Sequence, residues 1–345
     1  MKKRLIALVT AMFLLLGLAA CTSNTSTGST GQGGSGDAGG GEKVWKFAIV
    51  FNGPVNDGGW NQNAWNGLEQ LKETYGDQVE ITYAEKVEQA DYEDTFYGYA
   101  KDGYDMIVAN GYEFSDAAMR VAEEFPEVKF AIINGLNYTD NVFALEFDNV
   151  ELGYICGLAA GAQARELGTN VGFIGAEEIP SYKNFYAGLT AAVASIAPDV
   201  EVKAFYTGDW SDITKATEMA NTAISSGYEV LVPWVSAVNH AIYAAAKEQG
   251  VKFVQTTMEM DSGDYADNII INTDQSNAAL VRMAGEACIN DSIPEDGRIL
   301  GNLSNDINII NSWGTTLDDS VKSEVDALYE SIRKGEIEMP EKVAE

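Results

Sequence analysis

The sequence contains a single histidine, His240. We therefore expect neither a catalytic triad that depends on histidine nor a metal site built from several histidines. No pattern in the sequence places two acidic residues together as a catalytic pair. We therefore expect a protein that is not an enzyme and that holds no metal or cofactor. A hydrolase remains an alternative, because paired carboxylates can work without histidine.

Basic residues are also scarce. The chain has 22 Lys and Arg residues against 52 Asp and Glu residues, which gives a formal net charge of -30 at pH 7. Such a surface repels nucleic acid and anionic lipid, so we expect no nucleic-acid partner. The charge also disfavours phosphorylated solutes and favours a neutral or cationic ligand. Alternatively, the acidic charge serves solubility alone.

Cysteine occurs only three times, and Cys21 belongs to the N-terminal segment. Cys156 and Cys288 lie in helical patterns rich in alanine and glycine. That setting favours buried free thiols, because free cysteine packs as a small apolar residue. A disulfide between the two is the alternative in an oxidising compartment.

The N-terminal segment predicts export. Basic residues at 2–4 precede an apolar run at 5–18, which ends in Leu18-Ala-Ala-Cys21. The run is shorter than the ~20 apolar residues that span a bilayer, so residues 1–20 are predicted to be a removable signal peptide. The ending resembles the lipobox of bacterial lipoproteins, which implies that Cys21 carries lipid and anchors the protein outside the cytoplasm. An ordinary secretory signal with an incidental cysteine is the alternative.

The segment that follows Cys21 is predicted to be a tether. Residues 22–41 are almost entirely Ser, Thr and Gly, with no large apolar side chain to bury. Such composition gives a flexible chain rather than a folded one. We assign residues 21–43 to the lipidated cysteine and its tether.

The remaining chain, from residue 44 on, is longer than one hydrophobic core usually organises, so we expect two lobes. Short apolar runs alternate with amphipathic stretches, which indicates βαβ units and parallel sheets. The predicted elements of the first pattern are 45–51, 61–75, 78–83, 92–101, 105–109, 115–124, 129–133, 141–147 and 150–167. The pattern then restarts, with elements at 170–175, 182–197, 201–206, 211–226, 229–233, 237–249 and 252–256.

Three further elements, at 268–273, 276–289 and 298–302, are expected to return to the first lobe. The fold class is therefore α/β, with two doubly wound parallel-sheet lobes joined by a hinge. Ligands of parallel sheets bind beyond the carboxyl ends of the strands, so the cleft between the lobes is the expected site. The predicted lobes are 44–150 with about 268–305, and 151–267 with about 306–345.

One segment after the first strand has the composition of a binding loop. Asp57-Gly58-Gly59 permits a tight turn and brings Trp60 and Asn61 to the carboxyl edge of the sheet, where a helix begins. A flat aromatic face then lies beside several hydrogen-bonding groups. This combination suits a heteroaromatic ring, whose face stacks while its polar rim is hydrogen-bonded. Trp65 points from another face of the helix and is expected to pack in the core.

The segment 57–67, Asp-Gly-Gly-Trp-Asn-Gln-Asn-Ala-Trp-Asn-Gly, resembles the basic membrane protein family of solute-binding lipoproteins. The likeness continues through 111–117, 124–130, 153–161, 179–188, 210–216 and 244–247. It implies a type I periplasmic-binding-protein fold, and a receptor that captures a purine nucleoside or base for an ABC permease and ATPase. Another aromatic or sugar-like solute, or a ligand sensor that signals to a membrane partner, are the alternatives.

The resemblance also implies the ligand-binding residues. Trp60 would stack on the base, with Asp57 and Asn61 hydrogen-bonding nearby and Tyr112 lining the wall of the first lobe. The second lobe and the sugar side would contribute Tyr182, Trp210, Trp234, Asp261 and Asn272. Alternatively, the two tryptophans of this set cap the core of the second lobe. The chain departs from the family pattern on the sugar side, where it offers Asn272 or Asp274, so nucleoside and free base both stay open.

Overall fold

The computed structural model describes residues 43–135, 137–235, 238–256 and 262–343. The predicted signal peptide, Cys21, residues 22–42 of the tether and Asp261 lie outside the described residues. Within the described ranges, no helix combines the length and the apolar character needed to cross a bilayer.

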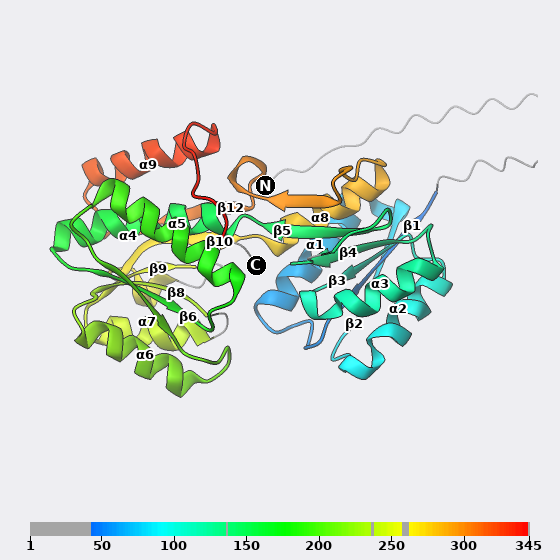
Figure 1. The fold of residues 1–345 in the computed structure, drawn as a ribbon, viewed down its shortest axis with the longest axis horizontal. Helices are drawn as coiled ribbons and strands as arrows, with labels where there is room; N and C mark the ends of the chain where they lie inside the picture. The colour runs from blue at the N-terminus through cyan, green and yellow to red at the C-terminus, as the bar shows by residue number, and fades with distance from the viewer. Residues whose placement is uncertain (1–42, 136, 236–237, 257–261, 344–345) are drawn as a thin grey trace, which may run out of the picture. The chain divides into compact units, whose positions relative to one another are not determined.

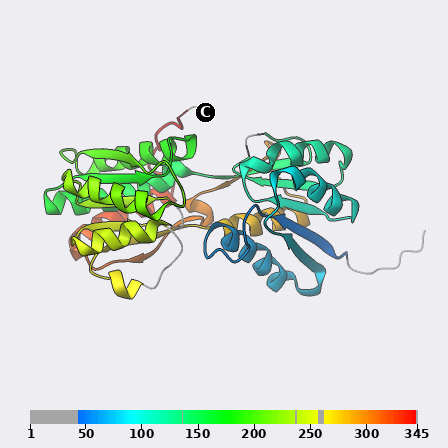
Figure 2. The same cartoon turned by 90° about the horizontal axis from the view of Figure 1, so that it is seen from below.

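The first lobe is built on a six-stranded sheet of the order β11-β5-β4-β3-β1-β2, in which every strand pair is parallel. Its strands are β1 (Trp45–Val50), β2 (Val79–Ala84), β3 (Met106–Ala109), β4 (Lys129–Ile133), β5 (Val142–Phe147) and β11 (Arg298–Gly301). Helices α1 (Trp60–Tyr75) and α8 (Asn277–Ile289) cover one face, and α2 (Tyr92–Lys101) and α3 (Ser115–Glu124) cover the other (Figures 1 and 2). Burial on both faces explains why β1, β3 and β4 are nearly continuous apolar runs.

The second lobe repeats this construction on a six-stranded sheet of the order β12-β10-β9-β8-β6-β7, with β12 antiparallel at one edge. Its strands are β6 (Val171–Gly175), β7 (Val202–Tyr206), β8 (Val230–Trp234), β9 (Lys252–Gln255), β10 (Ile269–Gln275) and β12 (Asn308–Trp313). Its helices are α4 (Asn149–Leu167), α5 (Pro180–Ile196), α6 (Ile213–Ser225), α7 (Asn239–Glu248) and α9 (Asp319–Arg333). Helices α4 and α5 lie on one face and α6 and α7 on the other (Figure 1).

Helices α4 and α5 pack closely because glycine stands where they touch. A methyl group on Gly153 would collide with the carbonyl oxygen of Phe185, and one on Gly188 would collide with that of Val150. Cys156 also lies on α4, where its Sγ is 3.8 Å from the Thr273 Oγ1 on β10. Both Cys156 and Cys288 are free and buried, and burial raises the pKa of each thiol to about 12. The expectation of buried, unpaired cysteines is confirmed.

One strand was assigned to the wrong lobe. The sequence pattern predicted that residues 268–273 return to the first lobe, but β10 pairs in parallel with β9 and antiparallel with β12, in the second sheet. Its run Ile269-Ile-Ile271 is buried there. The apolar run predicts that this strand belongs to a sheet, but it does not predict which one, because both sheets have an edge that can accept a strand. Only after β10 does the chain return to the first lobe, where α8 packs on α1 and β11 pairs with β5.

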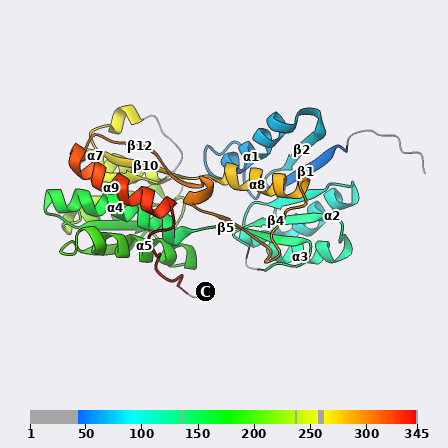
Figure 3. The ribbon, with the colours of Figure 1, turned by 90° about the horizontal axis from the view of Figure 1, so that it is seen from above.

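The described chain therefore crosses between the sheets three times: from β5 into α4, from β10 into α8, and from β11 into β12. Figure 3 shows α8 alongside α1 and α9 alongside α4, in agreement with the contacts between these helices. Several crossovers are the expected connection between two lobes that move about a hinge.

Candidate functional site

The loop between β1 and α1 is organised by Asp57. Its carboxylate accepts hydrogen bonds from the backbone N–H groups of Gly59 at 2.8 Å, Asn61 at 3.1 Å and Gln62 at 3.1 Å. These N–H groups belong to the start of α1, which has no helical carbonyl to satisfy them. Gly58 takes the positive φ of 71° that the turn requires. Asp57, predicted as a ligand-binding residue, thus fixes the start of the helix that carries Trp60.

Trp60 keeps 36% of its surface exposed. Its indole Nε1–H donates to the carbonyl oxygen of Asn110 at 3.2 Å, and its ring lies 6.2 Å from that of Phe147. From α8, the Asn277 side chain donates to the Trp60 carbonyl oxygen at 3.3 Å. The ring is therefore held by Asn110 and Phe147, and its N–H is already used within the first lobe. What it offers to a ligand is an aromatic face.

Asn61 is buried, and its side chain is engaged within the lobe. It donates to the Pro54 carbonyl oxygen at 3.2 Å and accepts from the Asn110 side chain at 2.8 Å. Asn110, which the sequence reasoning missed, directly follows β3 and is 1% exposed. Its Oδ1 is buried and has no hydrogen-bond partner within the described ranges. Its position directly after the apolar run 106–109 is the sequence signal that could have identified it.

Tyr112 lies just beyond β3 and is 63% exposed. Next to it, Glu113 accepts a hydrogen bond from the Asn52 side chain, which follows β1, at 2.6 Å. Burial raises the pKa of Glu113. Glu113 was also missed from sequence, and it adds an acidic group to the carboxyl ends of β1 and β3.

Three aromatic residues predicted in the second lobe come together. Tyr182 is buried near the start of α5, and its Oη accepts a hydrogen bond from the Trp210 Nε1–H at 3.2 Å. Its ring centroid lies 4.9 Å from that of Trp234, which ends β8 and also stacks on Phe185 at 4.7 Å. Burial raises the pKa of Tyr182 to about 12, so its hydroxyl stays protonated. Trp234 belongs to the core of the lobe, whereas Trp210 is 43% exposed.

The loop that carries Trp210 is held by two aspartates. Asp209 accepts hydrogen bonds from the backbone N–H groups of Ser211 at 2.8 Å and Asp212 at 3.0 Å, and these bonds lower the pKa of Asp209. Asp212 caps α6 by accepting from the N–H groups of Thr214 and Lys215. Trp210 is thus placed in the same way as Trp60, beside an aspartate that orders the turn before a helix.

A third set of predicted residues lies on β10. Asn272 is almost completely buried and accepts a hydrogen bond from the Asn311 side chain at 3.0 Å, while its Nδ2 has no partner in the part of the chain that the structure describes. Asp274 stands two residues further, on the same side of the strand, and burial raises its pKa. The two alternatives from the sequence are therefore neighbours. Asp261 lies outside the described residues.

Six of the predicted residues fall into two groups. Asp57, Trp60 and Asn61 gather around Asn110 in the first lobe, and Tyr182, Trp210 and Trp234 form one aromatic cluster in the second. Trp65 packs against the first core and meets Tyr83 edge-on at 5.0 Å, which confirms its expected packing role. Among the described residues, no group of three His, Cys, Asp or Glu side chains is placed to hold a metal ion.

The family model described as "ABC transporter substrate-binding protein PnrA-like" matches residues 44–342. The CD4+ T-cell-stimulating antigen of Listeria monocytogenes is 30% identical over 258 residues, which cover 72% of this chain and 69% of the relative. A purine-binding protein of Brucella abortus is 28% identical and covers 61% of this chain and 59% of its own.

A nucleoside-binding protein of an ABC transporter from Lactococcus lactis is 30% identical, over 59% of this chain and 58% of its own length. Among solved structures, an ABC transporter solute-binding protein from Conexibacter woesei matches with a TM-score of 0.69 and 24% identity. The match covers 86% of this chain and 99% of that protein. At this identity the structural likeness supports the two-lobed α/β fold of the type I solute-binding proteins.

Proposed function

The chain belongs to the family of PnrA-like ABC transporter substrate-binding proteins, and from this membership we propose that it captures a purine nucleoside or nucleobase outside the cytoplasm. It delivers this ligand to an ABC permease and its ATPase. The purine-binding and nucleoside-binding relatives from Brucella abortus and Lactococcus lactis support this ligand class.

The proposal rests on the exposure and hydrogen bonding of two tryptophans. Trp60 in the first lobe and Trp210 in the second each remain more than a third exposed, and each spends its indole N–H inside its own lobe. Neither side chain has a hydrogen-bonding group left, so each recognises a ligand through its aromatic face. A planar ring has two faces and can stack on both indoles. Each stacking contact adds about 0.5–1.5 kcal/mol of binding free energy beyond the contribution of the area that it buries.

Three polar residues at or near the strand ends of the two lobes suit the rim and the substituent of such a ring. Glu113 lies at the strand ends of the first lobe, and Asn272 and Asp274 lie on β10 of the second. The unpaired Nδ2 of Asn272 is a donor, and carboxylates accept from sugar hydroxyl or ring N–H groups. These acids, and the net charge of -30, disfavour a phosphate on the ligand. The proposal is therefore a nucleoside or base, not a nucleotide.

We propose that the lipid anchor is Cys21 and that the segment 22–43 is the tether. Several acyl chains, at ~0.8 kcal/mol per buried methylene, would hold the receptor at the membrane. Metabolic labelling with a radioactive or clickable fatty acid tests the anchor. Labelling is expected in the full chain and lost in Cys21→Ala, and labelling that persists in the variant would assign the lipid to another residue.

The ligand is tested by denaturing the purified full-length protein and identifying the released small molecules by mass spectrometry. Protein expressed in rich medium is expected to release a purine nucleoside or base in an amount that approaches the protein concentration. Recovery of a sugar or an amino acid alone, at the same stoichiometry, would overturn the purine assignment. The family membership would stand in that case.

A further inference from the structure

The three crossovers between the lobes are tied to one another at one place. The Gln275 side chain, at the end of β10, donates to Asn149 Oδ1 at 2.9 Å and to Asn308 Oδ1 at 3.3 Å. The Asn308 side chain, at the start of β12, donates to the Asp148 carbonyl oxygen at 2.8 Å. Each of these residues stands where the chain passes from one sheet to the other. We call this set, residues 148–151, 275 and 302–308, the hinge network.

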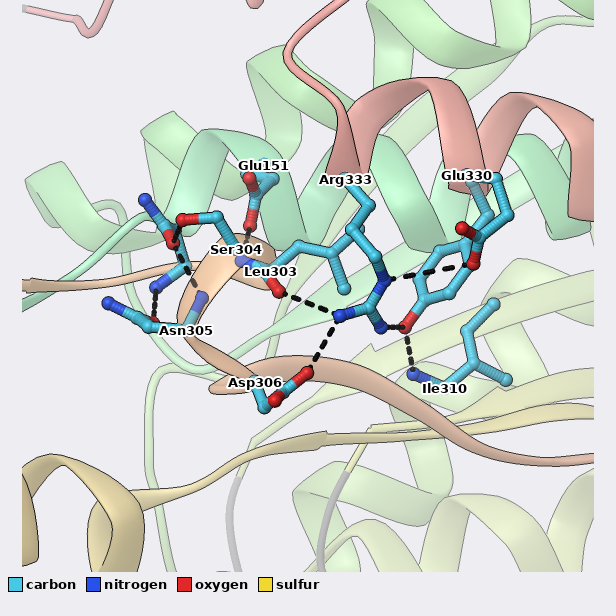
Figure 4. A network of polar contacts seen from close by, with 10 residues as sticks. Glu151, Leu303, Ser304, Asn305, Asp306, Ile310, Glu330 and Arg333 are labelled. Carbon is cyan, nitrogen blue, oxygen red and sulfur yellow. Dashed lines mark hydrogen bonds and ion pairs between the residues drawn. The ribbon is translucent and has the colours of Figure 1, made fainter.

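Glu151 lies at the centre of the hinge network. It is in the first turn of α4, 8% exposed, and one of its carboxylate oxygens accepts from the Leu303 N–H at 2.6 Å and from Asn308 Nδ2 at 3.0 Å. Figure 4 shows the bond to Leu303. Both donors are neutral amide groups. A carboxylate among neutral donors keeps its full charge, which burial makes costly.

Arg333, the cation that lowers the pKa of Glu151, forms its ion pairs with other residues. The Arg333 guanidinium, at the end of α9, pairs with Asp306 at 2.7 Å and donates to the Leu303 carbonyl oxygen at 3.3 Å (Figure 4). It also lies 3.7 Å from Glu330 and donates to the Tyr329 hydroxyl. Arg333 therefore acts on Glu151 at a distance and not through an ion pair.

The pKa of Glu151 is shifted by its burial and by four neighbouring residues. Burial raises its pKa, the bonds from Asn308 and Leu303 lower it, Asp148 at the start of α4 raises it, and Arg333 lowers it. The sum raises the pKa of Glu151 to about 7. Other acids near the network are Asp306, which Arg333 neutralises, and Asp274 on β10, whose own pKa burial raises.

We propose that Glu151 is a pH-sensitive lock in the hinge: its protonated form stabilises the hinge network as described, and its ionised form favours a rearrangement that hydrates the carboxylate. Protonation removes a buried charge while the carbonyl oxygen of the acid still accepts from Leu303 and Asn308. The three crossovers are bonded to one another, so hydration of Glu151 requires them to shift together. Proton binding and the arrangement of the lobes are then linked, and each biases the other.

The size of this linkage follows from the pKa. If the rearranged hinge returns Glu151 to its ordinary pKa of 4.5, the equilibrium between the two arrangements changes up to tenfold per pH unit between about 5 and 7. Over the whole range the change is at most about 300-fold. Such a shift converts a minor arrangement into the major one near neutral pH.

The test uses the full-length protein with spin-labelled amino acids introduced at two exposed sites, Glu69 on α1 and Glu218 on α6. Pulsed electron paramagnetic resonance measures the distance between the labels from pH 5 to pH 8.5. The distance distribution is expected to change in the parent between about pH 5 and pH 7 and to be constant above that range. It is expected to stay constant in Glu151→Gln, which keeps the acceptor oxygen without the titration.

Glu166→Gln is the matched control, because Glu166 is an exposed acid at the other end of the same helix. This variant is expected to follow the parent. A parent distribution that does not change with pH, or a change that persists in Glu151→Gln, would overturn the proposal. Carbon-13 NMR of glutamate side chains in the parent gives an independent reading: the Glu151 carboxyl is expected to titrate near pH 7, and a midpoint below about pH 5 would refute the lock.

Discussion

The indole N–H of Trp210 donates to the phenolic oxygen of Tyr182 at 3.2 Å, and this bond ties an exposed aromatic ring to a buried one. Tyr182 is in turn fixed by its contact with Trp234 and by Gly175, where any side chain would strike the tyrosine ring. The exposed ring is therefore preorganised, which reduces the entropy lost when a ligand stacks on it.

Tyr182→Phe tests this arrangement. The variant keeps the ring and its packing but leaves the Trp210 N–H without its partner, so Trp210 becomes more mobile. Ligand affinity is expected to fall about fivefold, which corresponds to the ~1 kcal/mol of a typical hydrogen bond. Isothermal titration calorimetry measures the affinity, and the fluorescence anisotropy of the tryptophans reports the mobility.

Tyr186→Phe is the control for Tyr182→Phe. It removes the hydroxyl of another tyrosine of α5, which donates to the Val202 carbonyl oxygen at 3.0 Å, away from Trp210. Its affinity is expected to equal that of the parent. An equal loss of affinity in both variants would show that general destabilisation of α5, and not the orientation of Trp210, is responsible.

Trp60→Ala is expected to weaken ligand binding about tenfold or more while the protein stays folded, because the ring stacks on the ligand and is only partly buried. Trp65→Ala is the matched control on the same helix, since Trp65 packs against the first core and Tyr83. This second change is expected to lower the melting temperature and to affect affinity less. Calorimetry measures the ligand affinity of both variants, and thermal unfolding measures their melting temperatures. If Trp60→Ala binds the ligand like the parent, Trp60 is not a stacking residue.

The raised pKa of Glu151 predicts that the stability of the protein depends on pH in a specific way. Its pKa in the folded protein is about 7, above the ordinary 4.5, so between these values the folded state holds a proton that the unfolded state has released. Its contribution to stability is therefore full below about pH 4.5 and is lost as the pH rises to about 7. Chemical denaturation of the parent and of Glu151→Gln should differ with a slope of at most about 1.4 kcal/mol per pH unit in this window. Parallel curves for the two proteins would contradict the raised pKa.

Close packing of α4 and α5 gives a stability prediction. Gly188→Ala places a methyl group against the Val150 carbonyl oxygen, and the free energy of unfolding is expected to fall by about 2 kcal/mol or more. Gly98→Ala in α2 is the control, because no atom lies within contact distance of the added methyl. It is expected to stabilise the helix by roughly 0.5–1 kcal/mol. Equal effects of the two changes in urea denaturation would show that helix propensity, not the contact with Val150, dominates.

Most strands and helices could be predicted because their apolar runs and amphipathic periods are local properties of the chain. The sheet that β10 joins could not, since pairing depends on which edge is free after both sheets have formed. Trp60 was found for the same local reason, as an aromatic residue directly after a glycine turn. The burial of Asn110 beside Asn61 depends on a contact across the fold, which sequence spacing does not determine.

Glu151 illustrates the same limit. A glutamate at the start of the apolar helix 149–167 was visible in the sequence, but a charged residue in a first helical turn is common and suits the helix dipole. Only the contacts with Leu303 and Asn308, more than 150 positions away, show that it lies between two crossovers.

Calorimetric titration of the full-length protein, freed of bound ligand by partial unfolding and refolding, tests the central claim most directly. The titrants are adenosine, guanosine, inosine and their free bases, with ribose and the corresponding 5′-monophosphates for comparison. We predict saturable binding of at least one nucleoside or base at a single site, and much weaker binding of ribose and of the monophosphates. Absence of binding by every purine, together with tight binding of a sugar or an amino acid by the same preparation, would contradict the account.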